Sequence, residues 1–220
     1  MSHVIPLQPA EQITILPNIS WETFDHLLQD MGNQRGQRLT YTGGILEIMS
    51  PLGEHEHDNR FIESLIGVLA DELDIPIKRL GSLTLKSPEL GIGVEPDSCY
   101  YIAREPSVRN KQHIDLSVDP PPDLVLEIDI SNHSLNKLPL YASLKIPEIW
   151  RYNGKELMVF HLQGDNSSYE KRASSSILPR MEIAKIPYWI ARSLETGETA
   201  TLRQFRTWLR NSGAPQQESP

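Results

Sequence analysis

The feature that most constrains this fold is a segment that is apolar on one side and acidic on the other. The stretch PPDLVLEIDIS at positions 121–131 alternates residue by residue, and successive side chains of a β-strand point to opposite faces of a sheet. The alternation gives an apolar and a mainly acidic face: Leu124, Leu126, Ile128 and Ile130 against Asp123, Val125, Glu127 and Asp129. The apolar face belongs on a core, which leaves Glu127 and Asp129 together on the other face.

A second segment has the same mixed character. In VEPDSCYYI, positions 94–102, the alternation places four residues on one side: Glu95, Asp97, Cys99 and Tyr101. If this segment lies beside the first, Asp97 faces Glu127 and Asp129. Three carboxylates in one small patch repel one another at neutral pH unless a cation lies among them. Hard divalent cations take oxygen ligands, so the pattern predicts a site for Mg²⁺ or Mn²⁺.

The balance of acidic and basic residues limits the classes of function that we expect for this chain. The 220-residue chain carries 29 acidic and 21 basic residues, a formal net charge of −8. Proteins that coat nucleic acid non-specifically depend instead on an excess of Lys and Arg. The basic side chains concentrate in residues 171–210. An acidic body with a basic C-terminal region suits a metal site better than a non-specific DNA-binding surface.

Three further features of the sequence bear on the cellular compartment in which we expect the protein. The single Cys99 permits no internal disulfide, and the first residues contain neither a basic segment nor an unbroken apolar run of the kind that directs secretion. No apolar run approaches the roughly 18–20 residues that a membrane-spanning helix needs. We therefore expect a cytoplasmic protein that is not inserted in a membrane.

Periodicity and turn residues predict one domain over residues 18–210, preceded by a loose arm at 1–17 and followed by a disordered tail at 211–220; the serine run at 174–176 is also expected to be disordered. The expected elements are a helix at 21–31, a hairpin at 38–49, a helix at 54–73, strands at 77–86, 93–103 and 123–130, a helix at 132–144 distorted by Pro139, a hairpin at 147–163 with a further strand at 169–173, and two C-terminal helices. The predicted order of elements in the middle of the chain is therefore helix, three strands, helix, strand.

These patterns together resemble a known family. EPD at 95–97 and EID at 127–129, within an αβββαβ order, look like the motif of the PD-(D/E)xK nuclease superfamily. Five stretches in order more narrowly resemble the Uma-type family of restriction-endonuclease-like bacterial proteins, a domain of unknown function: ISWETFDHLL, ILEIMSPLGEHEH, VEPDSCYYI, PPDLVLEIDIS and KLPLYASLKIPEIWRY. The resemblance covers residues 18–210. It implies an α/β fold with a restriction-endonuclease-like mixed sheet flanked by helices, a homodimer, and a Mg²⁺-dependent endonuclease that hydrolyses DNA.

The resemblance also assigns roles to residues. Asp97 matches the motif Asp and Glu127 matches the acidic residue of the (D/E)xK pair, so both are expected to bind the metal. Asp129 stands where the superfamily has Lys, and a carboxylate can bind metal or accept a proton but offers no positive charge to a phosphate. In some members the lysine lies on the following helix, where this chain has Lys137, with Tyr141 one turn later on the same face.

Two more residues complete the expected site if the family layout holds. Glu47 ends the first hairpin, and His57 lies in the first turn of the long helix. The His-Glu-His run at 55–57 does not predict zinc, because its i, i+2 spacing places the two rings on different helix faces.

Each of these residues also has a structural interpretation. Asp97 can begin a turn after Pro96, and alternating acids are more often the solvated face of an edge strand. Lys137 and Glu47 can be surface residues, His57 can be a hydrogen-bonded packing residue, and the arginines of the last helix can form a solvated face. Two rival functions therefore stay open: a nuclease fold that is catalytically weakened and serves as a binding module, and a metal hydrolase acting on another phosphoester.

Overall fold

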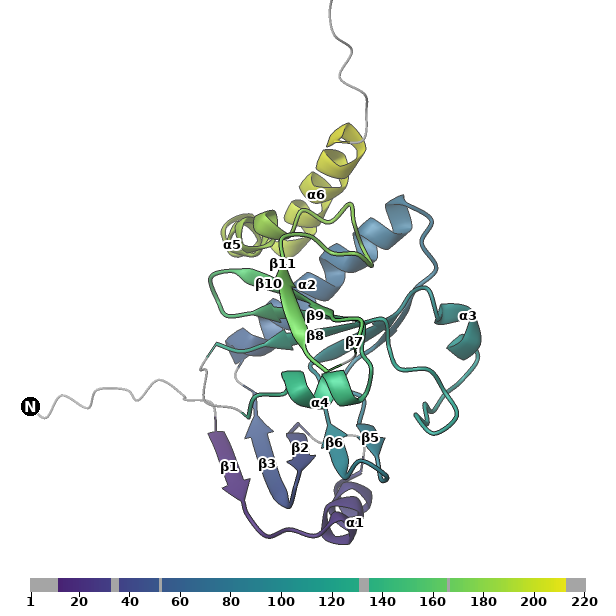
Figure 1. Ribbon diagram of the computed structural model, residues 1–220. Helices are drawn as coiled ribbons and strands as arrows, with labels where there is room; N and C mark the ends of the chain where they lie inside the picture. The colour runs from purple at the N-terminus through teal and green to yellow at the C-terminus, as the bar shows by residue number, and fades with distance from the viewer. Residues whose placement is uncertain (1–11, 33–35, 52, 131–134, 166, 213–220) are drawn as a thin grey trace, which may run out of the picture.

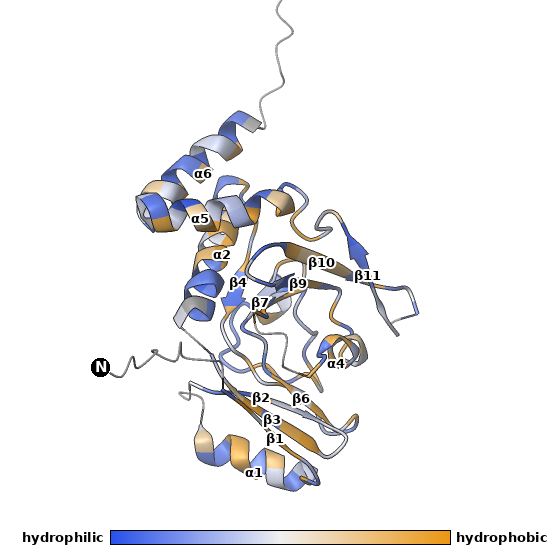
Figure 2. Ribbon diagram, turned by 90° about the vertical axis from the view of Figure 1, so that its left-hand side faces the viewer, coloured by the Kyte–Doolittle hydropathy of each residue, from blue (hydrophilic) through white to orange (hydrophobic). Residues whose placement is uncertain are grey.

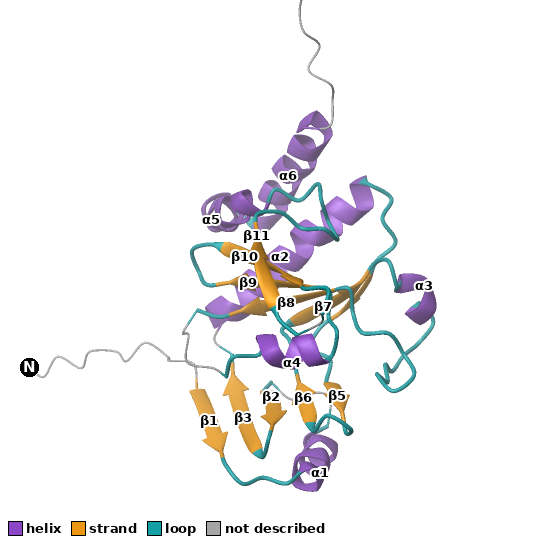
Figure 3. Ribbon diagram, in the orientation of Figure 1, coloured by secondary structure: helices purple, strands orange, loops and turns teal. Residues whose placement is uncertain are grey.

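Two β-sheets organise the computed structural model, which describes residues 12–32, 36–51, 53–130, 135–165 and 167–212 (Figure 1). The six-stranded sheet has the order β11-β10-β9-β8-β7-β4 and the five-stranded sheet the order β1-β3-β2-β6-β5. The short helix α4 (Leu138–Ser143) lies between the two sheets, as the secondary-structure colouring also shows (Figure 3). The fold is mixed α/β, as predicted.

The six-stranded sheet contains the predicted order of elements. Its strands are β4 (Lys78–Leu80), β7 (Ser98–Tyr101), β8 (Leu124–Ile128), β9 (Glu148–Tyr152), β10 (Leu157–Leu162) and β11 (Tyr169–Arg172). β4, β7 and β8 pair antiparallel, and β8 pairs parallel with β9. Helix α2 (Gly53–Glu72) precedes β4, and α4 connects β8 to β9. Within this sheet the succession α2, β4, β7, β8, α4, β9 confirms the αβββαβ core.

The five-stranded sheet forms around the predicted hairpin. Its strands are β1 (Gln12–Leu16), β2 (Arg38–Thr42), β3 (Ile45–Ser50), β5 (Leu85–Ser87) and β6 (Ile92–Val94). Gly43 and Gly44 turn the hairpin with φ angles of 54° and 82°, which suit glycine. Helix α1 (Trp21–Met31) begins after the cap Ser20, and its Phe24 ring lies so close to Gly93 that a Cβ there would be 2.3 Å from the ring.

Two predicted strands each divide between the sheets. The stretch 77–86 becomes β4 and β5, and 93–103 becomes β6 and β7, so the chain leaves the six-stranded sheet after β4 and returns at β7. The interruptions fall at Gly81-Ser82 and at Pro96, residues that end strands because glycine is flexible and proline lacks a backbone N–H. A hairpin of the second sheet is thereby inserted into the middle of the core order.

Three predicted boundaries differ from the structure. Residues 12–16, placed in the loose arm, form β1 and pair antiparallel with β3. Helix α4 begins at Leu138 rather than 132, and Pro139 lies in its first turn instead of distorting its interior. The last helix, α6 (Glu198–Ser212), ends beyond the predicted domain boundary. Residues 1–11, 131–134 and 213–220, on which parts of these predictions fall, lie outside the described residues.

The two faces of the six-stranded sheet pack on different layers. Leu124, Leu126 and Ile128 belong to the core under α2, α5 (Ile186–Thr196) and α6. Val125 and Cys99 belong to the core shared with α4 and the five-stranded sheet. Hydrophobic residues accordingly predominate in the inner strands, whereas the edge strands β4 and β11 are largely hydrophilic (Figure 2). A short helix, α3 (Glu105–Val108), lies in the connection from β7 to β8. None of the helices in the described part of the chain is both long and apolar enough to cross a bilayer.

Candidate active site

Asp97 and Glu127 lie next to each other on the α4 side of the six-stranded sheet. Strands β7 and β8 pair Ser98 with Leu126, so the next step of the register sets Asp97 opposite Glu127. Asp97 is 2% exposed and Glu127 7%. The backbone N–H of Ile128 donates to Asp97 Oδ2 at 2.8 Å. The alternation predicted this juxtaposition, and the structure places both carboxylates as expected.

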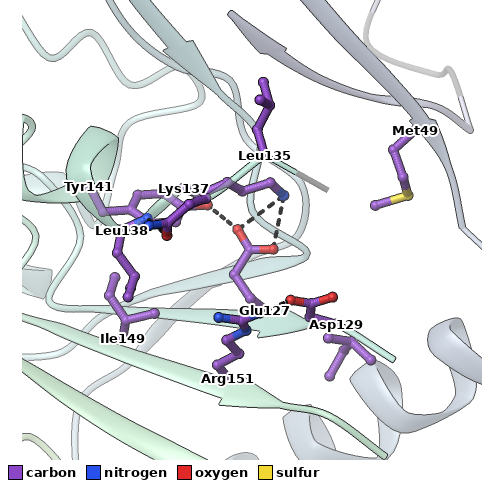
Figure 4. A pocket seen from close by; sticks show the side chains of 11 residues that line it. Met49, Glu127, Asp129, Leu135, Lys137, Leu138, Tyr141, Ile149 and Arg151 are labelled. Atoms are coloured by element: carbon purple, nitrogen blue, oxygen red, sulfur yellow. Dashed lines mark hydrogen bonds and ion pairs between the residues drawn. The ribbon is translucent and has the colours of Figure 1, made fainter. Parts of the chain in front are cut away.

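Glu127 is held by two donors from the segment that follows its strand. Lys137 Nζ lies 3.0 Å from Glu127 Oε2 and 3.2 Å from Oε1, and the Tyr141 hydroxyl also donates to Oε1 (Figure 4). Burial raises the pKa of Glu127, and the neighbouring Asp97 adds to this, while Lys137 and Tyr141 act in the opposite sense. Lys137 therefore points to the acids, as predicted, and occupies the N-cap position of α4 rather than its interior.

Lys137 carries its positive charge among three carboxylates. Burial alone lowers the pKa of Lys137, but the charges of Glu127, Asp97 and Glu47 outweigh it and raise that pKa overall. Glu47 comes from β3 of the other sheet, is buried, and accepts the backbone N–H of Leu135 at 2.7 Å. The structure thus brings four of the predicted residues into one group, with Lys137 as a protonated ammonium inside it.

Asp129 lies at the wall of a small pocket beside this group. The pocket has a volume of about 110 Å³, and it is lined by Met49, Glu127, Ile128, Asp129, Leu135, Asn136, Lys137, Leu138, Tyr141, Ile149 and Arg151. Arg151, the register partner of Glu127 on β9, forms an ion pair with Asp129 (Figure 4). The acid at the third motif position is thus engaged by a guanidinium.

His57 does not join the group, which corrects the placement expected for it. Its Nδ1 lies 3.2 Å from Asp58 Oδ1, its Nε2 lies 3.6 Å from Glu198 of α6, and its ring stacks on Phe61. His55, two residues earlier on α2, faces the site instead. Two residues correspond to about 200° of rotation around a helix. His55 and His57 therefore project from opposite faces of α2, and a prediction that names the wrong histidine places the imidazole on the wrong face.

Sequence reasoning missed several groups that surround Asp97. His55 Nε2 lies 3.4 Å from Asp97 Oδ2, and Arg38 Nε lies 3.8 Å from Asp97 Oδ1. Asn59 donates to the backbone carbonyl of Asp97 at 3.4 Å. The i, i+4 spacing of His55 and Asn59 was the available signal, because such pairs share one helix face. Arg38 lies on the other sheet, and its sequence position gave no signal.

The donor chemistry fits a hard dication, although the side chains as they lie form an incomplete cage. Within the described ranges no group of three or more His, Cys, Asp or Glu residues is arranged to hold a metal ion. Mg²⁺ commonly binds through one or two carboxylates, with water and substrate oxygens completing its shell. Asp97 and Glu127 provide two such carboxylates, and the like-charge repulsion between them favours a cation.

Comparison with known proteins gives one family match and a structural match. The family model Uma2, described as "Putative restriction endonuclease", matches residues 21–186. Among solved structures, the chain is similar to one described as a "putative nuclease belonging to DUF820 from Anabaena variabilis ATCC 29413". The two are 15% identical with a TM-score of 0.53, over 87% of this chain and 99% of that one, which shows a shared fold. No curated protein matches the chain.

Proposed function

The chain belongs to the Uma2 family, and on that premise we propose that the protein is a nuclease that hydrolyses DNA phosphodiester bonds with Mg²⁺ or Mn²⁺. The observation that carries the proposal is the juxtaposition of Asp97 and Glu127, two buried carboxylates on paired strands with a protonated lysine beside them. Carboxylates are placed side by side in a protein interior at a cost in stability, which a bound cation offsets. The homodimer implied by the resemblance and the cytoplasmic location stay predictions.

The residues divide the chemistry between them. Asp97 and Glu127 would hold the cation, which when bound lowers the pKa of a water molecule and polarises a phosphate oxygen. Lys137 keeps its proton because three carboxylates surround it, so it offers a fixed positive charge to a phosphate that gains negative charge. Tyr141 and Lys137 together orient the carboxylate of Glu127.

Arg151 and Lys137 compensate for the departure at the third motif position. Asp129 cannot supply the positive charge of the motif lysine, yet the Arg151 guanidinium lies beside it in the same pocket. Two cationic side chains therefore face the space next to Glu127. On this proposal, the positive charge that the superfamily pattern has at the third motif position would come instead from Lys137, at the N-cap of α4, and from Arg151 on β9.

A non-catalytic binding module is the second candidate, and one observation favours it. Lys137 and Tyr141 already satisfy Glu127, so the carboxylate has an alternative to binding metal. Such a module keeps the fold but neither binds a dication at Asp97 nor cleaves DNA. The third candidate, hydrolysis of another phosphoester, is distinguished by the substrate that is cut.

The proposal is tested by nicking of supercoiled plasmid in Mg²⁺ or Mn²⁺. We expect the wild type to nick, and Asp97→Asn and Glu127→Gln to lose about 100-fold or more of the rate, since each removes a charge at the reacting centre. Glu170→Gln is the matched control, because Glu170 is an exposed acid on β11 that pairs with Arg172, and it should keep wild-type activity. Nicking that survives both site substitutions comes from another source and contradicts the assignment.

A further inference from the structure

His55 is a buried side chain whose polar atoms are not satisfied. It lies in the first turn of α2 and is 2% exposed. Neither ring nitrogen makes a hydrogen bond within the described part of the chain. A buried polar group without a partner destabilises the fold, and most such groups in native proteins have a partner. The position of His55 therefore requires an explanation that packing does not give.

The nearest polar atom to His55 is a carboxylate oxygen of the candidate site. His55 Nε2 lies 3.4 Å from Asp97 Oδ2, beyond the 2.7–3.2 Å or so that an N–H···O hydrogen bond prefers. That oxygen is fixed by the Ile128 N–H at 2.8 Å, and the other oxygen of Asp97 faces Arg38. The imidazole nitrogen and Oδ2 thus face each other without a hydrogen bond.

A separation of 3.4 Å is what two ligands of one metal ion show. Nitrogen and oxygen ligands lie about 2.0–2.2 Å from a dication. Two of them at 90–110° on one ion are then separated by about 3.0–3.5 Å. The His55–Asp97 distance falls in this interval. If the same contact is an ion pair, Nδ1 of the buried ring still has no hydrogen-bond partner among the residues that the structure describes.

We propose that His55 Nε2 is a nitrogen ligand of the dication held by Asp97, and that the site therefore selects a first-row transition-metal dication over Mg²⁺. The inference deepens the proposed function and rests on its metal site. Mg²⁺ prefers oxygen ligands, whereas imidazole favours transition metals. A nitrogen ligand beside the carboxylates raises the affinity for these metals and leaves that for Mg²⁺ almost unchanged.

His57 provides a matched control on the same helix. It is two residues away and faces Glu198 and Asp58 instead of Asp97. His55→Gln and His57→Gln make the same chemical change on opposite sides of α2. A difference between these variants therefore reports the position of the imidazole and not the loss of a histidine in general.

The test measures metal binding to the full-length chain by calorimetry and the metal's ligands by pulsed electron paramagnetic resonance. Mn²⁺ and Mg²⁺ are titrated separately, and bound Mn²⁺ is examined for ¹⁴N modulation of its electron spin echo. We expect Mn²⁺ to bind at least about tenfold more tightly than Mg²⁺, with nitrogen modulation, and His55→Gln to lose that signal and about 10–100-fold in Mn²⁺ affinity. His57→Gln should match the wild type.

The outcomes separate the inference from the proposed function. Wild-type protein that binds Mn²⁺ without nitrogen modulation, or a His55→Gln variant that keeps the signal, overturns the role of His55 and leaves the nuclease proposal standing. Protein that binds Mn²⁺ through nitrogen yet cuts no DNA overturns the nuclease and supports the ligand. Absence of any Mn²⁺ binding overturns both. The wild-type spectrum decides the matter even if His55→Gln does not fold.

Discussion

Two buried glutamates on neighbouring strands, Glu127 of β8 and Glu148 of β9, both accept hydrogen bonds but differ in the charges beside them. Glu148 is fully buried, and hydrogen-bond donors converge on its carboxylate: Trp150 Nε1 at 2.7 Å, the Ser175 hydroxyl at 2.5 Å, the Ser176 N–H and hydroxyl at 2.8 and 2.7 Å, and the Ile177 N–H at 3.3 Å. His161 Nε2 also lies 3.1 Å from it. Glu127 instead has the like charge of Asp97 beside it.

The difference separates a structural acid from a candidate catalytic one. Hydrogen-bond donors that converge on a carboxylate stabilise its charge and the fold together. A second carboxylate does the reverse, because like charges at short range raise each other's pKa. Burial of an acid on a strand is thus common to both glutamates. The neighbouring like charge distinguishes Glu127.

The largest expected effect is on stability at Glu148. Glu148→Gln puts an amide NH₂ against donors that need an acceptor, and leaves buried groups unsatisfied. We expect the free energy of unfolding to fall by about 3–5 kcal/mol, as when one partner of a buried charged network is removed. Urea denaturation monitored by circular dichroism measures it. A loss below about 1 kcal/mol would show that the donors are not holding the carboxylate.

A smaller effect is expected from the same substitution at Glu127. Burial and Asp97 raise the pKa of Glu127, so the folded state holds this proton more tightly than the unfolded chain, and stability is lost as the pH rises through the folded-state pKa. Gln does not ionise and avoids this loss, while Lys137 keeps Asp97 and Glu47 as neighbours. We expect Glu127→Gln to lie within about 1 kcal/mol of the wild type at pH 7.

Urea denaturation at pH 5 and pH 8 provides the check on Glu127. The difference in stability between wild type and Glu127→Gln should shift in favour of the variant at the higher pH. A variant that is destabilised as strongly as Glu148→Gln would place the two glutamates in one structural class and remove the distinction between them.

Local patterns predicted the parts of the fold that depend on nearby residues. Helix α1 with its cap Ser20, the glycine hairpin and the order of the core follow from periodicity and turn chemistry. The juxtaposition of Asp97 and Glu127 was also predictable, because strand alternation fixes which side chains share a face.

Features that depend on distant segments were not predictable. The serine run at 174–176 was expected to be disordered, yet Ser175 and Ser176 hydrogen-bond to Glu148, 27 and 28 residues earlier. The division of two predicted strands between the sheets depends on tertiary pairing. His57 was predicted in place of His55. The rotation of α2 about its own axis decides which of the two rings faces the acids, and residue type does not reveal that rotation.

The most direct test of the central claim is anomalous diffraction from crystals soaked in Mn²⁺. The account predicts a peak within ligand distance of the carboxylates of Asp97 and Glu127, and its loss in crystals of Asp97→Asn. Ordered crystals with no peak at these carboxylates, or with Mn²⁺ bound only elsewhere, would contradict the claim that this pair of strands forms a metal-dependent active site.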